Sequence, residues 1–362
     1  MRKRLMMVLA VVIACSVVFA ACGNGGTANR ASSSDETYDF IASCTLGAEV
    51  SPNWIKLFDK LQEESGGRLV TDNNIYWSGS LIPIPEIPKG LGSGAATISN
   101  IPSNNYPDVL PLSGRILQLP FLGLQDPLDT QDIYSQLLKE FPEMVKEFTD
   151  INIMPFGATT LGTYGMHFTD PKPVHLPGDL RGKKIIPYSL VFLPLLEDNN
   201  AAGSYIPPGQ AYESLEKGVV DGYLNSYAFQ MWFGLTELLA SHTEFGEYGA
   251  YQELNILGMN LDFYNALPED LQQLFWDIFI NNGGNRLMWA DTQDLLDNGK
   301  ADSVARGDTI VTLTPEEIEV WKEIVYPEHV KVLDEICAQR GDQVAYDIYN
   351  RILELIAEKY GA

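Results

Sequence analysis

Side chains that could carry out chemistry are few in this chain, and none stands in a recognised catalytic or metal-binding pattern. The four histidines are scattered without the spacing that metal ligands need: His167, His175, His242 and His329. The sequence contains no CxxC, HExxH, GxGxxG or P-loop motif, no triad-like order of Ser, His and Asp, and no paired carboxylates in a catalytic motif. It therefore predicts no catalytic residue, no cofactor and no metal site, which leaves binding through hydrogen bonds and aromatic contacts.

The best placed polar side chain is Asn225, at the end of the stretch Ala211–Asn225 (AYESLEKGVVDGYLN). Residues 211–217 have apolar spacing that predicts a short helix, and Gly218 stands where a left-handed C-cap would end it. The β-branched Val219 and the residue after it then predict the start of a strand. Asp221-Gly222 predicts a turn or kink, and the strand ends at Asn225.

The first half of the chain repeats this design over Pro88–Asn100, with a helix, a glycine stop at 92–94 and a strand that ends at Asn100. Two helix–glycine–strand units with an asparagine at the far end predict two α/β halves that face a shared crevice. Ligands bind outside the carboxyl ends of the strands in such sheets. The alternative is that both are ordinary repeats with surface asparagines.

Length and charge narrow the possible partners. The chain has 362 residues, enough for two domains, with 45% hydrophobic and 20% charged residues. Its formal net charge is −24. Removal of the predicted leader, which contains three of the 24 basic residues, would leave 21 basic and 48 acidic residues. The electric field of this excess negative charge repels nucleic acid and anionic lipid, so neither is an expected partner.

The N-terminus predicts export and a lipid. Basic residues 2–4 precede an apolar run that ends at Phe19-Ala20-Ala21-Cys22, which is typical of a signal peptide over 1–21. Small residues just before a cysteine resemble the bacterial lipobox, although Phe19 is atypical there, so Cys22 is the expected lipidation site. Residues 22–37 are then a polar tether. We expect an extracytoplasmic protein, lipid-anchored to the bacterial cell membrane in the periplasm or on the outer face, with plain secretion as the alternative.

Two cysteines follow the predicted lipidation site, Cys44 and Cys337. Export permits a disulfide between them. Two cysteines so far apart in sequence are more often two buried thiols, and the sequence leaves their pairing open.

The remaining helix signals indicate where the long elements begin and end. Ser51-Pro52 predicts a helix start, with Ser51 as N-cap, and Gly66-Gly67 predicts its end. Residues 227–239 predict an aromatic-rich helix, and Gly283-Gly284 predicts a kink in a helix that resumes after it. Thr314–Glu317 (TPEE) is a capping box that begins helices running to about residue 360.

Strands alternate with these helices, and predicted strands at 151–157 and 254–260 lead from one half of the chain to the other. This order predicts two α/β domains of discontinuous sequence.

The order of segments resembles the solute-binding proteins of tripartite ATP-independent periplasmic (TRAP) transporters, the DctP family. The likeness extends from about Tyr38 to the C-terminus, and Asp179–Ile185 (DLRGKKI) followed by Leu215–Gly222 (LEKGVVDG) carries most of it. The weaker matches are Glu64–Arg68, Gly79–Leu81, Leu119–Leu122, Pro173–Ile186 and Leu267–Gln272.

The resemblance implies a two-domain, periplasmic-binding-protein-like clam fold, type II-like, with a long bridging helix. We expect domain I over 38–160 plus 250–283, and domain II over 161–249 plus 284–362 with the bridging and C-terminal helices. The implied function is capture of a small organic solute in an interdomain cleft and its delivery to the membrane subunits of a TRAP permease driven by an ion gradient. A secreted hydrolase and a ligand-sensing binding protein without a transport role are the alternatives.

The sequence departs from the family at the arginines that hold a ligand carboxylate. One of them aligns with Ile186 and the other with Tyr164, whereas Asn225 matches the family's cleft asparagine and Asn100 the polar contact from the first domain. A guanidinium pairs well with a planar carboxylate. The ligand is therefore a carboxylate if another cation supplies the charge, for example one near 181–184, and a neutral or aromatic solute otherwise.

Aromatic side chains complete the expected ligand site. Phenol and amide groups beside aromatic walls suit a neutral, hydroxylated or partly apolar ligand. The alternative for the pair on the predicted helix, Phe229 and Trp232, is that they pack this helix onto its sheet. With the four residues above, the expected ligand-binding set is completed by Trp77, Tyr188, Tyr227 and Trp232.

Overall fold

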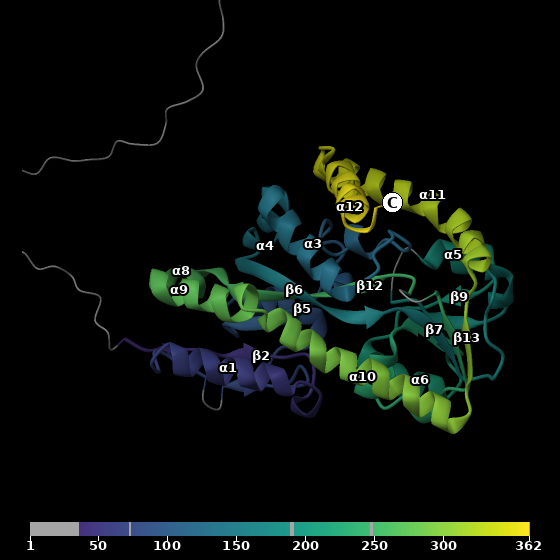
Figure 1. Ribbon diagram of the computed structural model, residues 1–362, viewed down its shortest axis with the longest axis horizontal. Helices are drawn as coiled ribbons and strands as arrows, with labels where there is room; N and C mark the ends of the chain where they lie inside the picture. The colour runs from purple at the N-terminus through teal and green to yellow at the C-terminus, as the bar shows by residue number, and fades with distance from the viewer. Residues whose placement is uncertain (1–35, 72–73, 189–191, 247–248, 362) are drawn as a thin grey trace, which may run out of the picture. The chain divides into compact units, whose positions relative to one another are not determined.

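Two β-sheets, each with parallel and antiparallel neighbours, form the centre of the chain (Figure 1). The first sheet has the strand order β4 (Ile75–Tyr76), β2 (Ala42–Ser43), β5 (Ile98–Pro102), β12 (Gln252–Asn260) and β6 (Ile153–Thr163). The second sheet has the order β13 (Thr309–Thr312), β11 (Ser241–Glu244), β7 (Gly165–Phe168), β10 (Gly222–Asn225), β8 (Lys184–Ile186) and β9 (Ala202–Gly203). A short parallel pair joins β1 (Tyr38–Asp39) to β3 (Leu69–Val70).

The structure is a computed structural model that describes residues 36–71, 74–188, 192–246 and 249–361. The predicted signal peptide, Cys22 and nearly all of the predicted tether lie outside these ranges. Within them, no helix combines the length and the apolar character that crossing a membrane requires.

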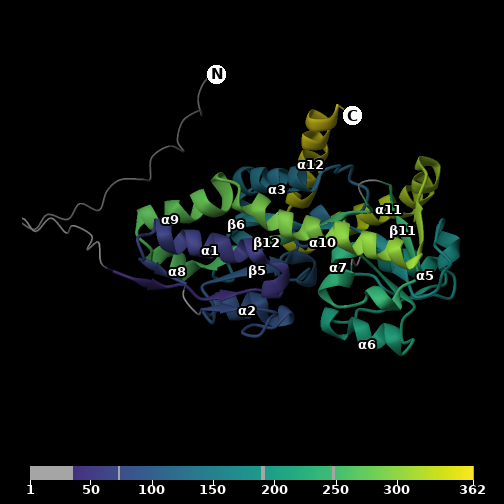
Figure 2. The ribbon, with the colours of Figure 1, turned by 60° about the horizontal axis from the view of Figure 1, so that its bottom comes forward.

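Helices cover both sheets, and one long helix extends along the two of them. Helix α10 packs against α1, strand β6 and α7, so it contacts elements of both sheets (Figures 1 and 2). Helix α11 packs on α5, and α12 packs on α3. The helices are α1 (Pro52–Glu64), α2 (Ile87–Gly92), α3 (Pro127–Glu140), α4 (Pro142–Thr149), α5 (Phe192–Asp198), α6 (Ala211–Glu216), α7 (Tyr227–Trp232), α8 (Leu261–Ala266), α9 (Glu269–Trp276), α10 (Gly284–Arg306), α11 (Pro315–Arg340) and α12 (Val344–Tyr360).

The chain passes between the sheets at Tyr164 and again between β11 and β12. Tyr164 is the single residue between β6 of the first sheet and β7 of the second. Its backbone N–H donates to the Tyr251 carbonyl at 3.0 Å, and its carbonyl accepts from the Ala250 N–H at 2.8 Å. The two crossings therefore lie side by side and are joined by backbone hydrogen bonds. The predicted division into domains I and II stays a prediction.

The segment 211–225 forms the predicted helix, and Gly218 ends it at φ +66°. The prediction that Val219 starts the strand was wrong, because β10 begins at Gly222 and Val219 is 56% exposed. The Asp221 carboxylate accepts from the Lys184 N–H at 2.7 Å. This bond fixes the loop beside β8, so that the parallel pairing of β10 with β8 begins one residue later.

The prediction that a strand ends at Asn100 was also wrong. Strand β5 continues to Pro102, because Ile101 and Pro102 still pair with β12. Asn100 therefore stands in the middle of the strand, and the first polar residues beyond the strand end are Ser103 and Asn104.

Helix ends follow the predicted signals with two exceptions. Gly66-Gly67 and Gly283 have φ between +66° and +81° where helices end or begin anew. Helix α7 stops at Trp232, well before residue 239, since Gly234 follows at φ +62°. Ser51 precedes α1, but its side chain makes no cap hydrogen bond at φ −139° and ψ +46°.

The predicted capping box at Thr314 is formed, and we expect it to contribute measurably to the free energy of unfolding. The Glu317 N–H donates to Thr314 Oγ1 at 3.2 Å, and the Thr314 N–H donates to Glu317 Oε2 at 2.8 Å. Thr314→Ala should lower the free energy of unfolding by about 1 kcal/mol. Ser51→Ala is the matched control and should change it by less than about 0.5 kcal/mol, because no cap bond is lost. Urea unfolding followed by circular dichroism measures both, and equal losses would contradict the assignment.

Candidate functional site

A cavity of about 50 Å³ lies where strand ends of the two sheets meet. The first sheet contributes Asn104, just after β5, and Glu253 in β12. The second sheet contributes Asn225, the last residue of β10, and Tyr188, two residues after β8. The remaining walls are mostly apolar or aromatic and include Leu161, Tyr164, Phe229, Trp232 and Phe233.

A wider hollow of about 320 Å³ adjoins this cavity. The two share part of their walls, and the shared residues are Thr45, Leu46, Ile84, Pro208, Trp232 and Phe233. Because they share so much of their lining, we treat them together as the cleft, with an inner and an outer part. Residues 78–79, after β4, reach the outer part.

Hydrogen bonds join the two sides of the cleft. Asn104 Nδ2 donates to the Tyr188 carbonyl at 3.1 Å. The Tyr205 hydroxyl donates to Asn105 Oδ1 at 2.9 Å. These two bonds connect residues that follow β5 with residues that follow β8 and β9.

Two buried polar atoms of the cleft walls have no hydrogen-bond partner among the residues that the structure describes. They are the hydroxyl of Tyr188 and the indole Nε1 of Trp232. Tyr188 is only 6% exposed and has φ +38°, an uncommon value for a residue other than glycine. An unpaired buried donor costs about 1–3 kcal/mol, and native structures rarely leave one without a functional reason. Both atoms are suited to bond an acceptor on a ligand.

Glu253 is the only charged side chain on the wall of the inner cavity, as far as the described residues go. It is 3% exposed, and the Tyr164 hydroxyl donates a hydrogen bond to its carboxyl group. Burial raises the pKa of Glu253 well above its usual range, and the hydrogen bond from Asn104 offsets only part of that shift. The group is therefore held in its neutral form unless a positive charge comes close.

The structure brings four of the predicted ligand-binding residues together at the inner cavity: Tyr164, Tyr188, Asn225 and Trp232. Asn225 is 4% exposed, and its Oδ1 accepts from the Ser226 N–H at 2.7 Å. This bond fixes the amide plane, while Nδ2 donates to none of the described residues. Phe229, which lies on the same helix as Trp232, also lines the cavity.

The other four predicted residues lie elsewhere. Asn100 is buried, accepts from the Thr45 N–H at 2.9 Å and so positions a wall residue without lining the cavity itself. Ile186 is fully buried in the core opposite Tyr223. Trp77 packs against the hydrophobic core beside the first sheet. Tyr227 faces a different hollow, described next.

That second hollow is larger, about 700 Å³, and lies against α10. Its central carboxylate already has partners: Glu244 accepts from the Tyr227 hydroxyl at 3.3 Å and the Thr312 hydroxyl at 2.7 Å, and it pairs with Lys300 at 2.6 Å. Volume favours this hollow, and strands of both sheets reach it as well. The cleft differs in having buried polar atoms without a partner among the described residues, so we take the cleft as the candidate site.

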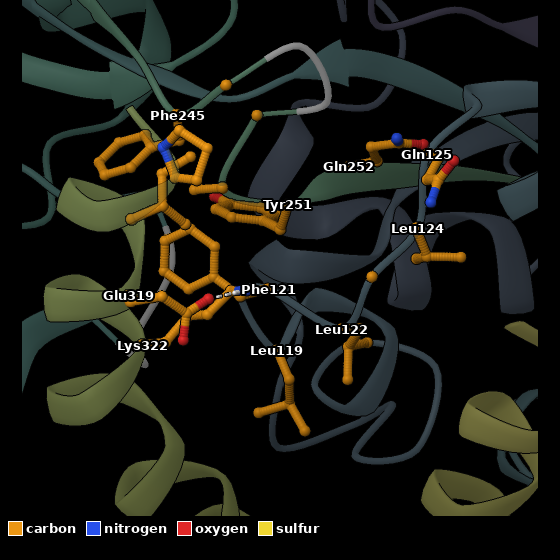
Figure 3. Close-up of a pocket in the computed structure, with 16 residues that line it drawn as sticks. Leu119, Phe121, Leu122, Leu124, Gln125, Phe245, Tyr251, Gln252, Glu319 and Lys322 are labelled. Atoms are coloured by element: carbon orange, nitrogen blue, oxygen red, sulfur yellow. Dashed lines mark hydrogen bonds and ion pairs between the residues drawn. The ribbon is translucent and has the colours of Figure 1, made fainter. Parts of the chain in front are cut away.

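A third hollow of about 340 Å³ lies between the loop 119–125, residues 245–246 and 249–252, and the start of α11 (Figure 3). Phe121 points toward Phe245 there, with ring centroids 5.7 Å apart, and the Glu319–Lys322 ion pair stands at its edge. The Phe121 N–H donates to the Ala250 carbonyl at 2.8 Å. This hydrogen bond holds the loop 119–125 against the second crossing.

Sequence reasoning missed Glu253 and Asn104. A weak signal for Glu253 existed, since a carboxyl group immediately precedes an otherwise apolar predicted strand at 254–260. Asn104 carried no such signal, because the end of β5 was placed too early.

It also missed a pair of histidines behind the cleft. Strands β7 and β11 place His167 opposite His242, with their Nδ1 atoms 2.7 Å apart. His167 Nε2 lies 3.0 Å from the Asn225 carbonyl, and His242 Nε2 lies 3.1 Å from Asp308. Burial lowers the pKa of both imidazoles. This hydrogen-bonded chain ends at the backbone carbonyl of Asn225 and holds it in place.

Two of the cations considered as substitutes for the arginines that the alignment predicts to be absent are engaged elsewhere. Lys184 Nζ donates to the Gly218 carbonyl at 2.5 Å, and Lys183 pairs with Asp170 at 2.6 Å. Arg181 is exposed near a turn. In the described part of the chain, no group of three His, Cys, Asp or Glu side chains is arranged to hold a metal ion. Cys44 and Cys337 are both buried free thiols, which resolves their pairing.

Two α/β lobes joined by paired crossings and a bridging helix, with a polar cavity between their strand ends, define a clam-like binding protein. Residues 50–335 match the model of the DctP family, bacterial extracellular solute-binding protein family 7, and the chain belongs to that family.

Comparison with solved structures gives the same fold. A TRAP solute-binding protein from Rhodoferax ferrireducens T118, crystallised with copurified benzoate, superimposes with a TM-score of 0.77 at 21% identity, covering 90% of this chain and 100% of that one. One from Anaerococcus prevotii DSM 20548, with bound D-glucuronate, gives 0.75 at 18% identity with coverages of 90% and 100%. The predicted two-domain α/β fold is confirmed.

A curated relative, a "solute-binding protein" of Chromohalobacter salexigens, is 25% identical over 170 residues. The match covers 46% of this chain and 48% of the relative, so the chain spans about half the length of the curated relative it matches.

The unpartnered hydroxyl of Tyr188 leads to a prediction for the protein without ligand. Tyr188→Phe should leave the free energy of unfolding unchanged or raise it by up to about 1 kcal/mol, since no hydrogen bond is lost and an unpaired buried group is removed. Tyr164→Phe should lower it by about 1–3 kcal/mol, because Glu253 then loses its donor. Urea unfolding of the two variants beside the wild type checks this, and a clear loss for Tyr188→Phe would show that its hydroxyl has a partner.

Proposed function

We propose that the protein captures a small organic solute in the cleft outside the cytoplasm and delivers it, chemically unchanged, to the membrane subunits of a TRAP-type permease. Membership of the family supports this function. The observation that carries it is the inner cavity, whose walls come from both lobes. The first lobe contributes the buried carboxyl group of Glu253, and the second contributes two buried polar atoms without a partner among the described residues, the Tyr188 hydroxyl and Trp232 Nε1. A ligand would complete these hydrogen bonds and hold the lobes together.

The walls of the cleft argue against a simple C4-dicarboxylate. Benzoate and glucuronate, the ligands of the two solved relatives, each carry a carboxylate. Here the described wall residues include no Lys, Arg or His. A carboxylate buried without a positive partner costs several kcal/mol, more than hydrogen bonds of about 1 kcal/mol each return. We infer a ligand without a carboxylate as its main anchor, and neutral polar or aromatic solutes fit better than dicarboxylates.

Binding should close the lobes without turnover. A solute identified by a thermal-shift screen of carboxylates and of neutral, aromatic and basic solutes should bind one per chain and decrease the radius of gyration in small-angle scattering. It should be recovered unchanged. Asn225→Ala should weaken binding by about 1–3 kcal/mol, since the ligand loses the amide. Asn100→Leu is the control outside the cavity wall: it should affect stability more than affinity.

A confirmed ligand that leaves the scattering profile unchanged would contradict the clam-like mechanism. Conversion of that ligand by the purified protein would favour a hydrolase. Micromolar binding of succinate or malate in calorimetry would overturn the argument from the missing arginines.

We also propose that Cys22 carries a lipid, which the lipobox-like residues before it support. Cys22→Ser should move the protein from the membrane fraction to the soluble fraction, because a thioether-linked lipid can no longer form. Cell fractionation followed by mass spectrometry of the N-terminus measures this. Wild-type protein that is already soluble and cleaved before another residue would exclude the anchor.

A further inference from the structure

We propose that the solute is a small organic cation, whose positively charged nitrogen is held by the Glu253 carboxylate inside the aromatic walls of the cleft. This inference rests on the proposed function and narrows it to one class of ligand.

The charges of the cleft point to a cation. The walls of its inner and outer parts carry two carboxyl groups, Glu253 deep inside and the exposed Glu49 at the outer part. No basic side chain stands among the described wall residues, as noted above. The chain as a whole has a net charge of −24. The negative charge of the whole chain, together with the exposed Glu49 at the outer part of the cleft, raises the local concentration of cations and speeds their association.

The surroundings of Glu253 supply hydrogen bonds but no compensating charge. Its neighbours from two packed segments are neutral groups: Tyr164 from the crossing, and Asn104 and Tyr106 from the segment after β5. The Tyr106 hydroxyl donates to the Ile84 carbonyl. Burial raises the pKa of Tyr106, so this phenol stays neutral and contributes no charge. A carboxyl group that is 3% exposed with no protein cation becomes ionised readily only when a positive charge enters the cavity.

The aromatic walls suit such a ligand. Tyr188 and Phe229 have ring centroids 4.8 Å apart. Trp232 is on the same short helix as Phe229, α7, and Phe233 directly follows that helix; both line the cleft. Aromatic faces attract a desolvated ammonium or guanidinium group, and Trp and Tyr do so best. The unpartnered Tyr188 hydroxyl and Trp232 Nε1 remain available as donors to an oxygen elsewhere on the ligand. The cleft therefore offers an anionic anchor, aromatic faces and donors.

A different explanation is that Glu253 only fixes Tyr164 at the crossing. In that case Glu253→Gln and Tyr164→Phe would change stability, and neither would alter the preference for a charge class. An experiment that measures charge preference separates the two explanations.

The experiment compares ligands of one shape and three charges. Benzylammonium, benzyl alcohol and benzoate are titrated into the mature protein by calorimetry, with choline, putrescine and guanidinium added as further cations. We expect a cation of this set to bind most tightly. Glu253→Gln should weaken that binding by at least about 30-fold, the loss typical of removing one partner of a buried charge pair. The affinity for benzyl alcohol should change by less than about threefold.

Protons provide a second readout. Because the free Glu253 has a raised pKa, binding of a cation should release a proton from it, and the affinity should rise with pH while the amine stays protonated. Calorimetry in two buffers of different ionisation enthalpy counts the released proton. The Glu253→Gln variant should release none and lose the pH dependence.

Two variants serve as controls. Glu147→Gln alters another buried carboxyl group, 7% exposed and bonded to the backbone N–H groups of Leu112 and Ser113, outside the cleft walls. It should leave cation affinity unchanged. The Glu253→Gln variant should unfold at the same or a higher urea concentration than the wild type. That result would show that lost binding is not caused by misfolding.

Tighter binding of benzoate or benzyl alcohol than of every cation would overturn the inference and leave the proposed function standing. So would a bound cation whose affinity Glu253→Gln does not change. Failure of every solute class in this set and in the wider thermal-shift screen would count against the proposed function itself.

Discussion

The structure depends on the place where two strands cross between the sheets and bond to each other. Tyr164 separates β6 from β7 by a single residue, and its N–H and carbonyl pair with Tyr251 and Ala250 of the other crossing. These two bonds hold the two crossing segments together at one point. Tyr164 also lines the inner cavity of the cleft. Its hydroxyl bonds Glu253, so the crossing and the candidate site share a residue.

The charge of the cleft is determined by the side chains that lie in or next to the strands around it. Strand β5 is two residues longer than predicted, so Asn100 lies within the sheet. Asn104, which follows the strand, therefore lines the cavity. Ile186, which the alignment predicts at the place of a carboxylate-binding arginine, lies fully buried in the core. Glu253 enters the cavity from β12 with no basic neighbour on the described walls. The cleft therefore offers a carboxyl group and no basic side chain among its described wall residues.

Polar groups in the second lobe show how a sheet supports a site from behind. His167, His242 and Asp308 form a buried chain that ends at the carbonyl of Asn225. Each bond fixes the next group, and the amide of Asn225 is fixed in turn by the Ser226 N–H. Such support matters for binding because a side chain already held in place loses little entropy when a ligand arrives.

Local features could be predicted from the sequence because their causes are local. A glycine at positive φ ends a helix wherever it stands, as at Gly218, and the Thr314 capping box needs only residues three apart. Alternation of strands and helices likewise indicated an α/β fold. Asn225 reaches the cavity because it ends a strand whose end the pattern gave, and Tyr164 reaches it because it directly follows β6.

What the sequence could not decide depends on pairing between segments far apart. Whether β5 ends at Asn100 or at Pro102 is set by its partner β12, about 155 residues later, whose register no local signal contains. The neighbourhood of Glu253 and the meeting of His167 with His242 arise in the same way. Charge and hydrogen-bonding capacity are properties of the residue and are present in the sequence. Which groups are left without a partner is a property of the packed structure, and here that decides the candidate site.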